Sequence, residues 1–434
     1  MAAALADLPV NDTIFALASG IPPAAIAVVR ISGPDAMSAA SALAGSLSQP
    51  RRASLRRLCD PANGETLDDA IMLCFPGPTT ATGEDLVELH LHGGRAVVRA
   101  VETALAALPG LRGAEPGEFT RRALAHGRID LAEAEGLGDL LSAQTERQRR
   151  AAMMAVEGKL SRCVGDWNDR VLAVAARVEA SLDFADEDDV GDELDPRLRG
   201  QLTDLAQAIG AVLEQPPVER LRDGIRVVLA GPRNAGKSTL LNALVERDAA
   251  IVSPIAGTTR DVIEVPTVRG GIAYVLTDTA GIAEATADPV EAIGIARARA
   301  ATESADIILW LDDIDPPGEA IWLYPRSDIR ETNTNLHRIT VSGMTGEGLE
   351  GLWQMIDQRG RDLLPREDRI ALNERQRSLA ESCRDALVRA ATEQDPLLVA
   401  EHLRLARRML DRITGRADVE AMLDSLFSRF CIGK

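Results

Sequence analysis

The sequence predicts a multidomain protein that combines α/β regions with purely helical regions. Three observations lead to this fold class. The chain has 434 residues, more than a single hydrophobic core usually organises. Its pattern changes from mixed α/β to helical near residue 125, and strands alternating with helices begin near residue 225. Helices return after Pro365, so the later α/β domain is inserted into a discontinuous helical domain.

The N-terminal domain is expected to span residues 1–125. Apolar β-like runs, such as AIAVVRIS at 25–32 and DLVELHLHGG at 85–94, are separated there by Pro-Gly punctuation. Leu/Ala periodicity predicts a helical domain whose first half is 126–222 and whose second half is 366–434. We interpret the acidic run DFADEDDVGDELD (183–195) within the first half as a solvated loop.

The inserted domain is expected to span residues 223–365. Five apolar runs alternate there with helical segments, which is typical of a doubly wound, mainly parallel sheet. The runs are IRVVLA (225–230), IAYVLTD (272–278), IILWLDD (307–313), AIWLYP (320–325) and RITVSG (338–343).

Composition limits the classes of function. Lys plus Arg total 48 against 66 Asp plus Glu, and a net charge of −18 is a poor footprint for a general nucleic-acid binder, although a local basic patch remains open. The five cysteines form no C-x-x-C pair, so neither a disulfide framework nor a cysteine zinc site is indicated. Without a membrane-length apolar run or a signal-peptide n-region, we expect a cytoplasmic protein with no membrane contact.

A phosphate-binding motif opens the inserted domain. GPRNAGKS, residues 231–238, fits G-x-x-x-x-G-K-[ST] and lies between a β run and a helix-like stretch. Backbone N–H groups of such a loop surround phosphate oxygens at a helix N-terminus. Lys237 is expected to reach the β- and γ-phosphates, and Ser238 to offer its hydroxyl to Mg²⁺.

Two further elements follow in the order found in GTPases. DTAG, residues 278–281, ends a strand with an acid suited to the outer shell of the metal. GTTRD, residues 257–261, offers Thr259 as a second Mg²⁺ hydroxyl in a switch loop. The ordered set predicts a Ras-like P-loop GTPase that binds GTP and Mg²⁺.

The base-reading motif departs from the usual Asn-Lys-x-Asp. Pro325-Arg326-Ser327-Asp328 keeps the carboxylate that accepts guanine N–H groups, and Arg326 can stack over the base. Pro325 has no side-chain amide, and Gly343 stands where GTPases usually carry Ala. We expect GTP binding of weakened affinity. The alternative stays open that Asp328 is only a turn residue, in a degenerate relative that does not distinguish between nucleotides.

The water-orienting glutamine of small signalling GTPases is also missing. The residue after Gly281 is Ile282, whose apolar side chain cannot orient water. Another residue must do so, and a cation must neutralise the charge of the transition state.

Several motifs together resemble one family along nearly the whole chain. NDTI (11–14), TGEDLVELHLHGG (82–94), EPGEFTRRALAHGRIDLAEAEGLGDLL (115–141), the P-loop domain and the terminal CIGK are similar to the MnmE (TrmE) tRNA-modification GTPases. The resemblance implies an N-terminal folate-binding and dimerisation domain related to glycine-cleavage T-proteins. It also implies a homodimer that joins an FAD-containing MnmG-type protein in a heterotetramer and acts on tRNA.

The implied reaction installs an aminomethyl or carboxymethylaminomethyl group at C5 of the wobble uridine. Its one-carbon unit would come from (6S)-5-formyl- or 5,10-methylene-tetrahydrofolate. The alternative is a GTP-dependent switch or assembly factor without one-carbon chemistry.

The resemblance also supplies the missing parts of the GTPase site. It implies a K⁺ ion in place of an arginine finger, held by Asn234, Ser253, Ile255 and Thr258, and it matches the water-orienting glutamate to Glu291. The catalytic set is then Glu291, Asn234 and Lys237. The implied GTP-binding set is Asn234, Ala235, Gly236, Lys237, Ser238, Thr239, Ser253, Pro254, Ile255, Ala256, Gly257, Thr258, Thr259, Asp278, Thr279, Ala280, Gly281, Arg326, Asp328, Ser342, Gly343 and Met344.

The implied folate contacts are Arg30, Glu88, Arg128 and Lys434. A carboxylate such as Glu88 can accept the N–H and 2-amino donors of a pterin. Cys431 has the position of a prenylation cysteine, but a terminal lysine does not fit that signal. The resemblance instead implies a tail that reaches the N-terminal domain, with Cys431 as a possible one-carbon-site cysteine.

Two groups of residues could have either a functional or a structural role. The arginines Arg121, Arg122, Arg404, Arg407, Arg408 and Arg412 could form a basic face for tRNA or a salt-bridged helix surface. His90 and His92 have the strand spacing of a metal pair, and we interpret them as structural because no further ligands accompany them.

Overall fold

The computed structural model describes residues 12–183, 195–232, 234–246, 263–279, 304–316, 318–331, 337–417, 423, 426–428 and 430–433. The chain forms two compact units. The first comprises Met1–Gly138, Met154–Glu193 and Gln394–Lys434, and the second comprises Asp139–Met153 and Leu194–Glu393. Among the described residues, none of the helices combines the length and apolar content that crossing a membrane requires.

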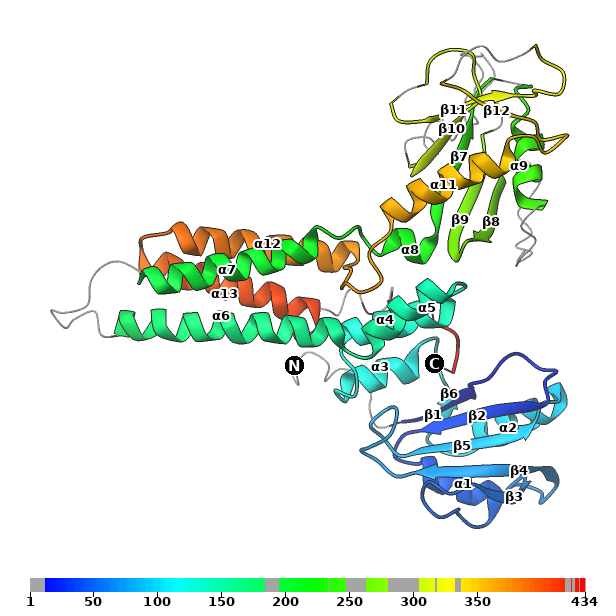
Figure 1. Cartoon of the computed structure of the whole chain (residues 1–434). Coiled ribbons are helices and arrows are strands. Elements are labelled where there is room, and N and C mark those ends of the chain that lie inside the picture. Colours follow the sequence, from blue (N-terminus) through cyan, green and yellow to red (C-terminus); the bar gives the residue numbers. More distant parts are fainter. Residues whose placement is uncertain are drawn as a thin grey trace, which may run out of the picture. The chain divides into compact units, whose positions relative to one another are not determined.

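The first unit is built on a six-stranded sheet with the order β3-β4-β5-β2-β1-β6 (Figure 1). Its neighbours are antiparallel except for the parallel pair of β1 and β6. The strands are β1 (Thr13–Leu17), β2 (Ile26–Ser32), β3 (Ser54–Cys59), β4 (Thr66–Phe75), β5 (Leu86–His92) and β6 (Leu111–Gly113).

The two faces of this sheet have different partners. Ala27, Val29 and Ile31 of β2 enter one core with α1 (Ala36–Ala44) and α2 (Arg95–Ala106). Side chains alternate along a strand, so the intervening Arg30 projects from the opposite face. There α3 (Glu118–Ala125) adds Phe119 to a small second core. The predicted ligand residue Arg30 therefore lies on the face that α3 covers.

The helices on either side of the inserted domain pack in pairs within each unit. In the first unit, α6 (Lys159–Asp183) packs against α13 (Pro396–Ile413). In the second unit, α7 (Pro196–Leu213) packs against α12 (Glu374–Thr392). Helices α4 (Leu131–Ser142) and α5 (Glu146–Val156) complete the first helical stretch. Each pair thus joins a helix before the inserted domain to one after it.

The second unit contains a six-stranded sheet with the order β12-β11-β10-β7-β9-β8. It is parallel except for β8, which pairs antiparallel with β9 at the edge. The strands are β7 (Ile225–Ala230), β8 (Ile263–Arg269), β9 (Ile272–Asp278), β10 (Ile307–Trp310), β11 (Ile321–Pro325) and β12 (Ile339–Val341). The short α8 (Glu219–Asp223) precedes β7, and α9 (Lys237–Glu246) and α11 (Leu349–Leu363) pack into the sheet's main core.

Two crossovers differ from the expected alternation of strands and helices. The described residues between β10 and β11, and between β11 and β12, contain no helix. Trp322 and Tyr324 project there from the face opposite the main core, and the guanidinium of Arg338 lies 5.1 Å and 4.9 Å from their ring centroids. Arg330 lies 4.2 Å from the centroid of Tyr324. Arginine–aromatic stacking therefore covers part of a face that a crossover helix usually buries.

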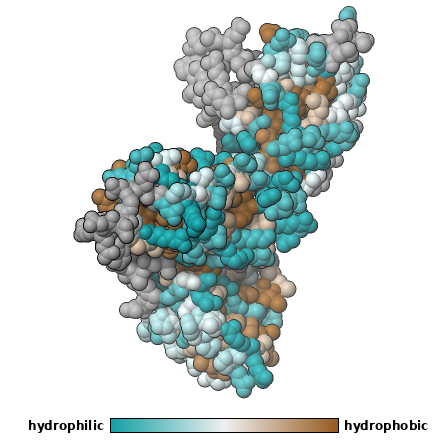
Figure 2. Space-filling view, turned by 60° about the vertical axis from the view of Figure 1, so that its left-hand side comes forward, coloured by the Kyte–Doolittle hydropathy of each residue, from teal (hydrophilic) through white to brown (hydrophobic). Residues whose placement is uncertain are grey.

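The face of the helical region that Figure 2 shows is mainly hydrophilic. Hydrophilic residues predominate over the helical part that faces the viewer in Figure 2, with smaller hydrophobic areas between them. On α13, exposed Arg404 lies within 3.8 Å of Glu179 and 3.6 Å of Glu401, and Arg407 lies 3.9 Å from Asp411. These arginines have the form of the salt-bridged helix surface named as one alternative.

Candidate nucleotide and folate sites

The phosphate loop joins β7 to α9 at the carboxyl edge of the parallel sheet. Lys237 is the first residue of α9, so the N-terminal N–H groups of that helix face the loop. Asn234 has a φ of 62°, a left-handed conformation that non-glycine residues seldom adopt. The local backbone thus has the strained, amide-lined form that binds phosphate oxygens.

Lys237 is buried inside this loop. Its ammonium donates to the carbonyl oxygens of Gly231 at 3.0 Å and Pro232 at 2.9 Å. Burial lowers the pKa of Lys237, and the negative charge of Asp278 partly opposes that shift. A phosphate oxygen is a stronger acceptor for an ammonium than a backbone carbonyl is. The ammonium is therefore placed to exchange loop carbonyls for phosphate oxygens.

Ser238 and Asp278 form the metal end of the site. The Ser238 hydroxyl donates to Asp278 Oδ2 at 2.5 Å. Asp278 is 8% exposed, and its Oδ1 has no hydrogen-bond partner among the described residues. A buried carboxylate oxygen without a donor is costly unless a cation or its water satisfies it. A hydroxyl beside a carboxylate fits Mg²⁺, which prefers oxygen ligands and retained waters.

The neighbouring Thr279 is also buried, but its side chain contacts the backbone of the sheet. Its hydroxyl donates to the Leu229 carbonyl at 2.7 Å. This bond joins the residue after β9 to the neighbouring strand β7. The hydroxyl of Thr279 therefore links two neighbouring strands of the sheet.

A single cleft of about 820 Å³ connects the phosphate loop with the base-reading turn. This volume lies in the range of small-molecule binding sites. The lining residues that the sequence also predicts are Asn234, Gly236, Lys237, Ser238, Thr239, Asp278, Arg326, Asp328, Gly343 and Met344. The fold thus brings together residues from both ends of the predicted nucleotide site.

At the base end, Asp328 is held by the turn that follows β12. Its Oδ1 accepts a hydrogen bond from the buried Ser342 hydroxyl at 2.6 Å, and Ser342 Oγ accepts from the Met344 N–H at 3.2 Å. Ser327 donates to Glu347 Oε2 at 2.7 Å, a second link between the same two turns. The hydrogen bond from Ser342 therefore holds the carboxylate of Asp328 in place.

Arg326 connects the base end to the phosphate loop. It has a φ of 60°, and its Nη1 donates to the Asn234 carbonyl at 3.2 Å. Its side chain also passes close to Gly236. The side chain of Arg326 thus joins two residues of left-handed conformation, Arg326 and Asn234, from the two ends of the cleft. The sequence did not predict this contact.

Gly343 has a steric explanation. A Cβ at this position would lie 2.9 Å from the Thr239 carbonyl oxygen and 3.0 Å from the Leu240 nitrogen. Real side chains do not tolerate such contacts with backbone atoms. The close approach of α9 therefore requires glycine where GTPases usually have alanine.

Several predicted residues lie outside the described ranges. They are Ser253, Pro254, Ile255, Ala256, Gly257, Thr258, Thr259, Ala280, Gly281, Glu291 and Lys434. Their assignments stay predictions from the sequence.

In the first unit, the fold pairs Arg30 with Glu88. The two residues are register partners on β2 and β5, and Arg30 Nη2 donates to Glu88 Oε1 at 2.8 Å. His90 Nε2 lies 3.5 Å from Glu88 Oε2, and the Arg30 guanidinium lies 5.8 Å from the Phe119 ring centroid. Arg128 donates to the Thr80 carbonyl at 3.0 Å. The Glu88 carboxylate is therefore already oriented by a neighbouring cation.

The C-terminal tail docks on this unit, as expected from the sequence. Ile432 forms a β-bridge with Pro116, and a Cβ on Gly433 would lie 2.1 Å from the Leu17 carbonyl oxygen. Phe427 and Phe430 pack in one cluster with residues of α3 and α4. Cys431 is exposed beside these contacts.

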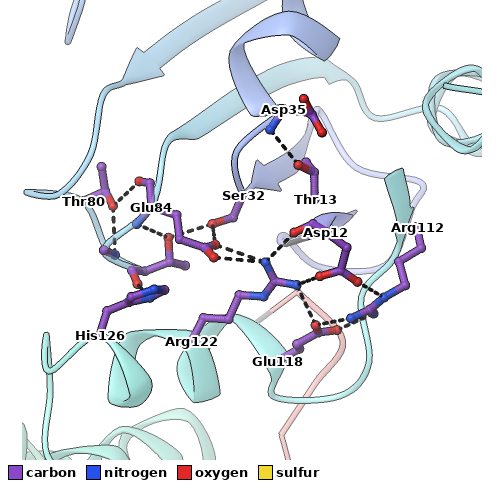
Figure 3. Close-up of polar contacts among 12 residues, drawn as sticks. Asp12, Thr13, Ser32, Asp35, Thr80, Glu84, Arg112, Glu118, Arg122 and His126 are labelled. Atoms are coloured by element: carbon purple, nitrogen blue, oxygen red, sulfur yellow. Dashed lines mark hydrogen bonds and ion pairs between the residues drawn. The ribbon is translucent and has the colours of Figure 1, made fainter. Parts of the chain in front are cut away.

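An ion cluster in this unit, buried around Arg122, Glu84 and Glu118, was missed by the sequence reasoning (Figure 3). Arg122 donates to Asp12 Oδ1 at 2.7 Å, Glu84 Oε1 at 3.1 Å and Glu118 Oε1 at 3.0 Å. Arg112 donates to Asp12 at 2.6 Å and to both Glu118 oxygens. Burial raises the pKa of Glu118, but hydrogen bonds from Arg112 and the other donors outweigh it and leave that pKa lowered.

This cluster corrects one alternative from the sequence. The side chain of Arg122 is 7% exposed and paired with carboxylates, so it cannot belong to a basic face for tRNA. Arg121 lies 5.9 Å from the ring centroid of Phe427 in the tail region. The missed signal was local, because Arg122 shares the buried face of α3 with Phe119 and Ala123 at helical spacing.

The two histidines have separate environments. His92 Nδ1 pairs with Asp68 Oδ1 at 2.7 Å, whereas His90 faces Glu88. Within the described ranges, no three His, Cys, Asp or Glu side chains group as a metal-ion site.

Comparisons with known proteins cover nearly the whole chain. The model for the MnmE helical domain matches residues 131–431, and that for the GTP-binding protein TrmE N-terminus matches residues 13–128. The tRNA modification GTPase MnmE of Erythrobacter litoralis is 57% identical over 98% of this chain and 100% of its own length. That of Rhizorhabdus wittichii is 56% identical over 98% of this chain and 97% of its own length.

Solved structures resemble smaller parts of the chain. Aquifex aeolicus Era bound to GDP.AlF4- is 24% identical, with a TM-score of 0.25 over 37% of this chain and 66% of that one. The G domain of T. maritima FeoB is 24% identical, with a TM-score of 0.24 over 31% of this chain and 98% of that one. From the helical-domain match and the full-length relatives, the chain belongs to the MnmE family of tRNA modification GTPases.

Proposed function

We propose that this GTPase uses the hydrolysis of GTP to drive the modification of C5 of the wobble uridine in tRNA. The observation that carries the proposal is the single cleft from Lys237 to Asp328 in a chain of this family. An FAD-containing MnmG-type partner and a tetrahydrofolate one-carbon unit complete the proposed reaction. The product carries an aminomethyl or carboxymethylaminomethyl group, and the working form is a homodimer within a heterotetramer.

At the phosphate end, three side chains have distinct roles. Lys237 leaves the loop carbonyls and binds the β- and γ-phosphate oxygens, while the N-terminus of α9 adds backbone donors. Ser238 and Asp278 would hold Mg²⁺, directly and through water respectively. When bound, Mg²⁺ neutralises charge on the phosphates. The orphan Oδ1 of Asp278 supports this assignment because it gains a partner.

At the base end, Asp328 selects guanine. Its carboxylate accepts the N1–H and the 2-amino group, a pair of donors that adenine does not present. Ser342 keeps the carboxylate in place, and Arg326 ties the base turn to the phosphate loop. These contacts support GTP binding without the usual asparagine amide, at reduced affinity.

For the chemical step, we propose that Glu291 orients the attacking water and that K⁺ takes the place of an arginine finger. Of the proposed K⁺ ligands, Asn234 lies on the cleft wall. Its backbone is bonded to Arg326, so the side chain that would face K⁺ starts from a fixed position. The charge of K⁺ would favour the transition state, in which negative charge builds up on the phosphate oxygens.

For the one-carbon step, we propose that Glu88 binds the pterin of tetrahydrofolate. Arg30 orients its carboxylate, and Arg128 and Lys434 complement the carbonyl and carboxylate groups of folate. Cys431 lies on the docked tail and is the candidate thiol near the one-carbon unit. The Arg30–Glu88 pair also suits a purely structural role, which would favour the alternative of a GTP-dependent switch without one-carbon chemistry.

Mass spectrometry of wobble uridines in cells lacking this protein tests the proposal. We expect C5 modification to disappear, to return with the wild-type chain, and to stay absent with Lys237→Ala or Glu88→Gln. Arg57→Gln is the matched control, since Arg57 and Asp69 form an exposed pair at 3.0 Å on the same sheet. Modification that persists without the protein contradicts the proposal. Modification restored by Glu88→Gln but not by Lys237→Ala favours the switch.

A further inference from the structure

The ion cluster around Arg122 joins segments that are distant in the sequence. Asp12 precedes β1, Glu84 precedes β5, and Glu118 begins α3. The exposed fractions of the Arg122, Glu84 and Glu118 side chains are 7%, 7% and 10%. Burying such charges is costly, and losing one partner leaves another unpaired. The cluster therefore fixes the relative positions of these segments to within hydrogen-bond geometry (Figure 3).

Glu84 transmits this position to the strands that carry the proposed pterin contacts. Its Oε2 accepts a hydrogen bond from the Ser32 hydroxyl at 2.7 Å. Ser32 lies on β2 with Arg30, and Glu84 leads directly into β5, which carries Glu88. The carboxylate bound by Arg122 thus lies at the end of the strand pair in which Arg30 contacts Glu88.

The same loop also contacts the segment that carries Arg128. His126 Nδ1 lies 2.8 Å from the Thr82 carbonyl oxygen, and Arg128 donates to the Thr80 carbonyl at 3.0 Å. Gly83 has a φ of 85°, and a Cβ there would lie 2.5 Å from the Cβ of His126. Glycine thereby permits a close approach that both the loop and the end of α3 depend on.

The cluster reaches the docked tail from its other side. Glu118 Oε2 accepts from the Glu115 N–H at 2.9 Å, which fixes the turn before α3. The next residue, Pro116, is the one that bridges to Ile432. One buried guanidinium therefore supports every described element that holds a proposed folate contact.

We infer that Arg122 is a positioning residue of the folate site, acting through Glu84 and Glu118 on the strands, the loop and the tail. It touches no ligand itself. The inference rests on the proposed function, because it concerns the same folate site. A guanidinium is suited to the role because its planar fork donates to several carboxylates at once, which an ammonium cannot do in the same geometry.

Calorimetric titration with 5-formyltetrahydrofolate tests the inference on the full-length protein. We compare wild type, Arg122→Met, Arg122→Lys and Glu84→Gln, with Arg57→Gln as an exposed-pair control. We expect Arg122→Met to raise the Kd by about 10- to 100-fold, taking as a guide the loss found when a metal ligand loses its outer-shell hydrogen-bond partner. Arg122→Lys should recover part of the affinity, and Glu84→Gln should raise the Kd less than Arg122→Met does.

GTP hydrolysis checks that the second compact unit stays intact in each variant. All variants should keep the wild-type kcat and KM for GTP, since the cluster lies in the other compact unit. An unchanged folate Kd in folded Arg122→Met overturns the inference but leaves the proposed function intact. If Arg122→Met does not fold, Glu84→Gln decides by the same criterion. A wild-type chain that binds no folate overturns both the inference and the folate part of the proposed function.

Discussion

The Ser238 hydroxyl lies 2.5 Å from the Asp278 carboxylate, across the gap between the first turn of α9 and the end of β9. These residues come from two separate motifs of the sequence. Their contact leaves Asp278 Oδ1 buried and without a partner among the described residues. The contact thus leaves one oxygen of the buried Asp278 carboxylate in a position where the proposed Mg²⁺ or its water could satisfy it.

Asp278→Asn should weaken the response to Mg²⁺. The amide keeps the size of the side chain and can accept from Ser238, but it removes the charge that would hold the metal's water. We expect the half-saturating Mg²⁺ concentration for GTP hydrolysis to rise at least about tenfold, equivalent to about 1.4 kcal/mol. Hydrolysis rates measured across a magnesium series check this, and an unchanged midpoint contradicts the assignment.

Pro325→Asn should tighten GTP binding. Asparagine restores an amide beside Asp328 and Arg326, and one net hydrogen bond contributes about 1 kcal/mol, or roughly fivefold in Kd. The companion change Gly343→Ala should weaken binding, because the added Cβ would lie 2.9 Å from the Thr239 carbonyl oxygen. Fluorescent-GTP titration measures both. Equal affinities in all three proteins would mean that the base turn does not limit binding.

The local motifs were the most predictable part of the fold and of the site. The phosphate loop is a continuous run whose strand and helix flanks adjoin it, so Lys237 and Ser238 follow from spacing alone. The strands of the second sheet were predicted from apolar runs, except β8, whose edge position leaves Glu264 and Pro266 in it. The two short crossovers were not predicted, although ten residues between β10 and β11 leave little room for a helix.

Long-range polar contacts were beyond the reach of the sequence pattern. Two partners of Arg122, Asp12 and Glu84, come from other segments, so nothing in the local sequence identifies them, whereas Glu118 lies four residues earlier on the same helix. The pairing of Arg30 with Glu88 likewise depends on the register of β2 and β5. Only the family resemblance pointed to these two residues. It implied folate as their ligand but did not predict that they contact each other.

His92→Gln should remove a pH-dependent stabilisation. The hydrogen bond to Asp68, and then the charge of Asp68, raise the pKa of His92 above its usual 6.5. The protonated form is thus favoured in the folded state, so the contribution is complete below about pH 6.5 and is lost as pH rises through the higher folded value. Urea midpoints should differ between variant and wild type near pH 5.5 and converge near pH 9. A difference that grows with pH would contradict this sign.

Asn234→Ala and Glu291→Ala should separate the two catalytic roles. If Asn234 holds K⁺, its variant loses the advantage of KCl over NaCl while retaining a slow rate. If Glu291 orients water, its variant loses about 10²- to 10⁴-fold in hydrolysis while the Kd for GTP stays nearly constant. Equal wild-type rates in both salts would contradict the K⁺ assignment, and loss of GTP binding by Glu291→Ala would indicate a structural role.

Deleting residues 431–434 should abolish wobble-uridine modification and spare GTP hydrolysis. The deletion removes the bridge between Ile432 and Pro116 and the contact of Gly433 with Leu17, all within the first unit. Phe427 and Phe430 stay in place, so the cluster with α3 and α4 should persist. Cys431→Ser in the full chain separates the thiol from the docking. Lost modification in that variant assigns chemistry to the thiol, whereas retained modification shows that the exposed thiol of Cys431 is not needed for the reaction. Modification that survives the full deletion would show that the docked tail is dispensable for the one-carbon site.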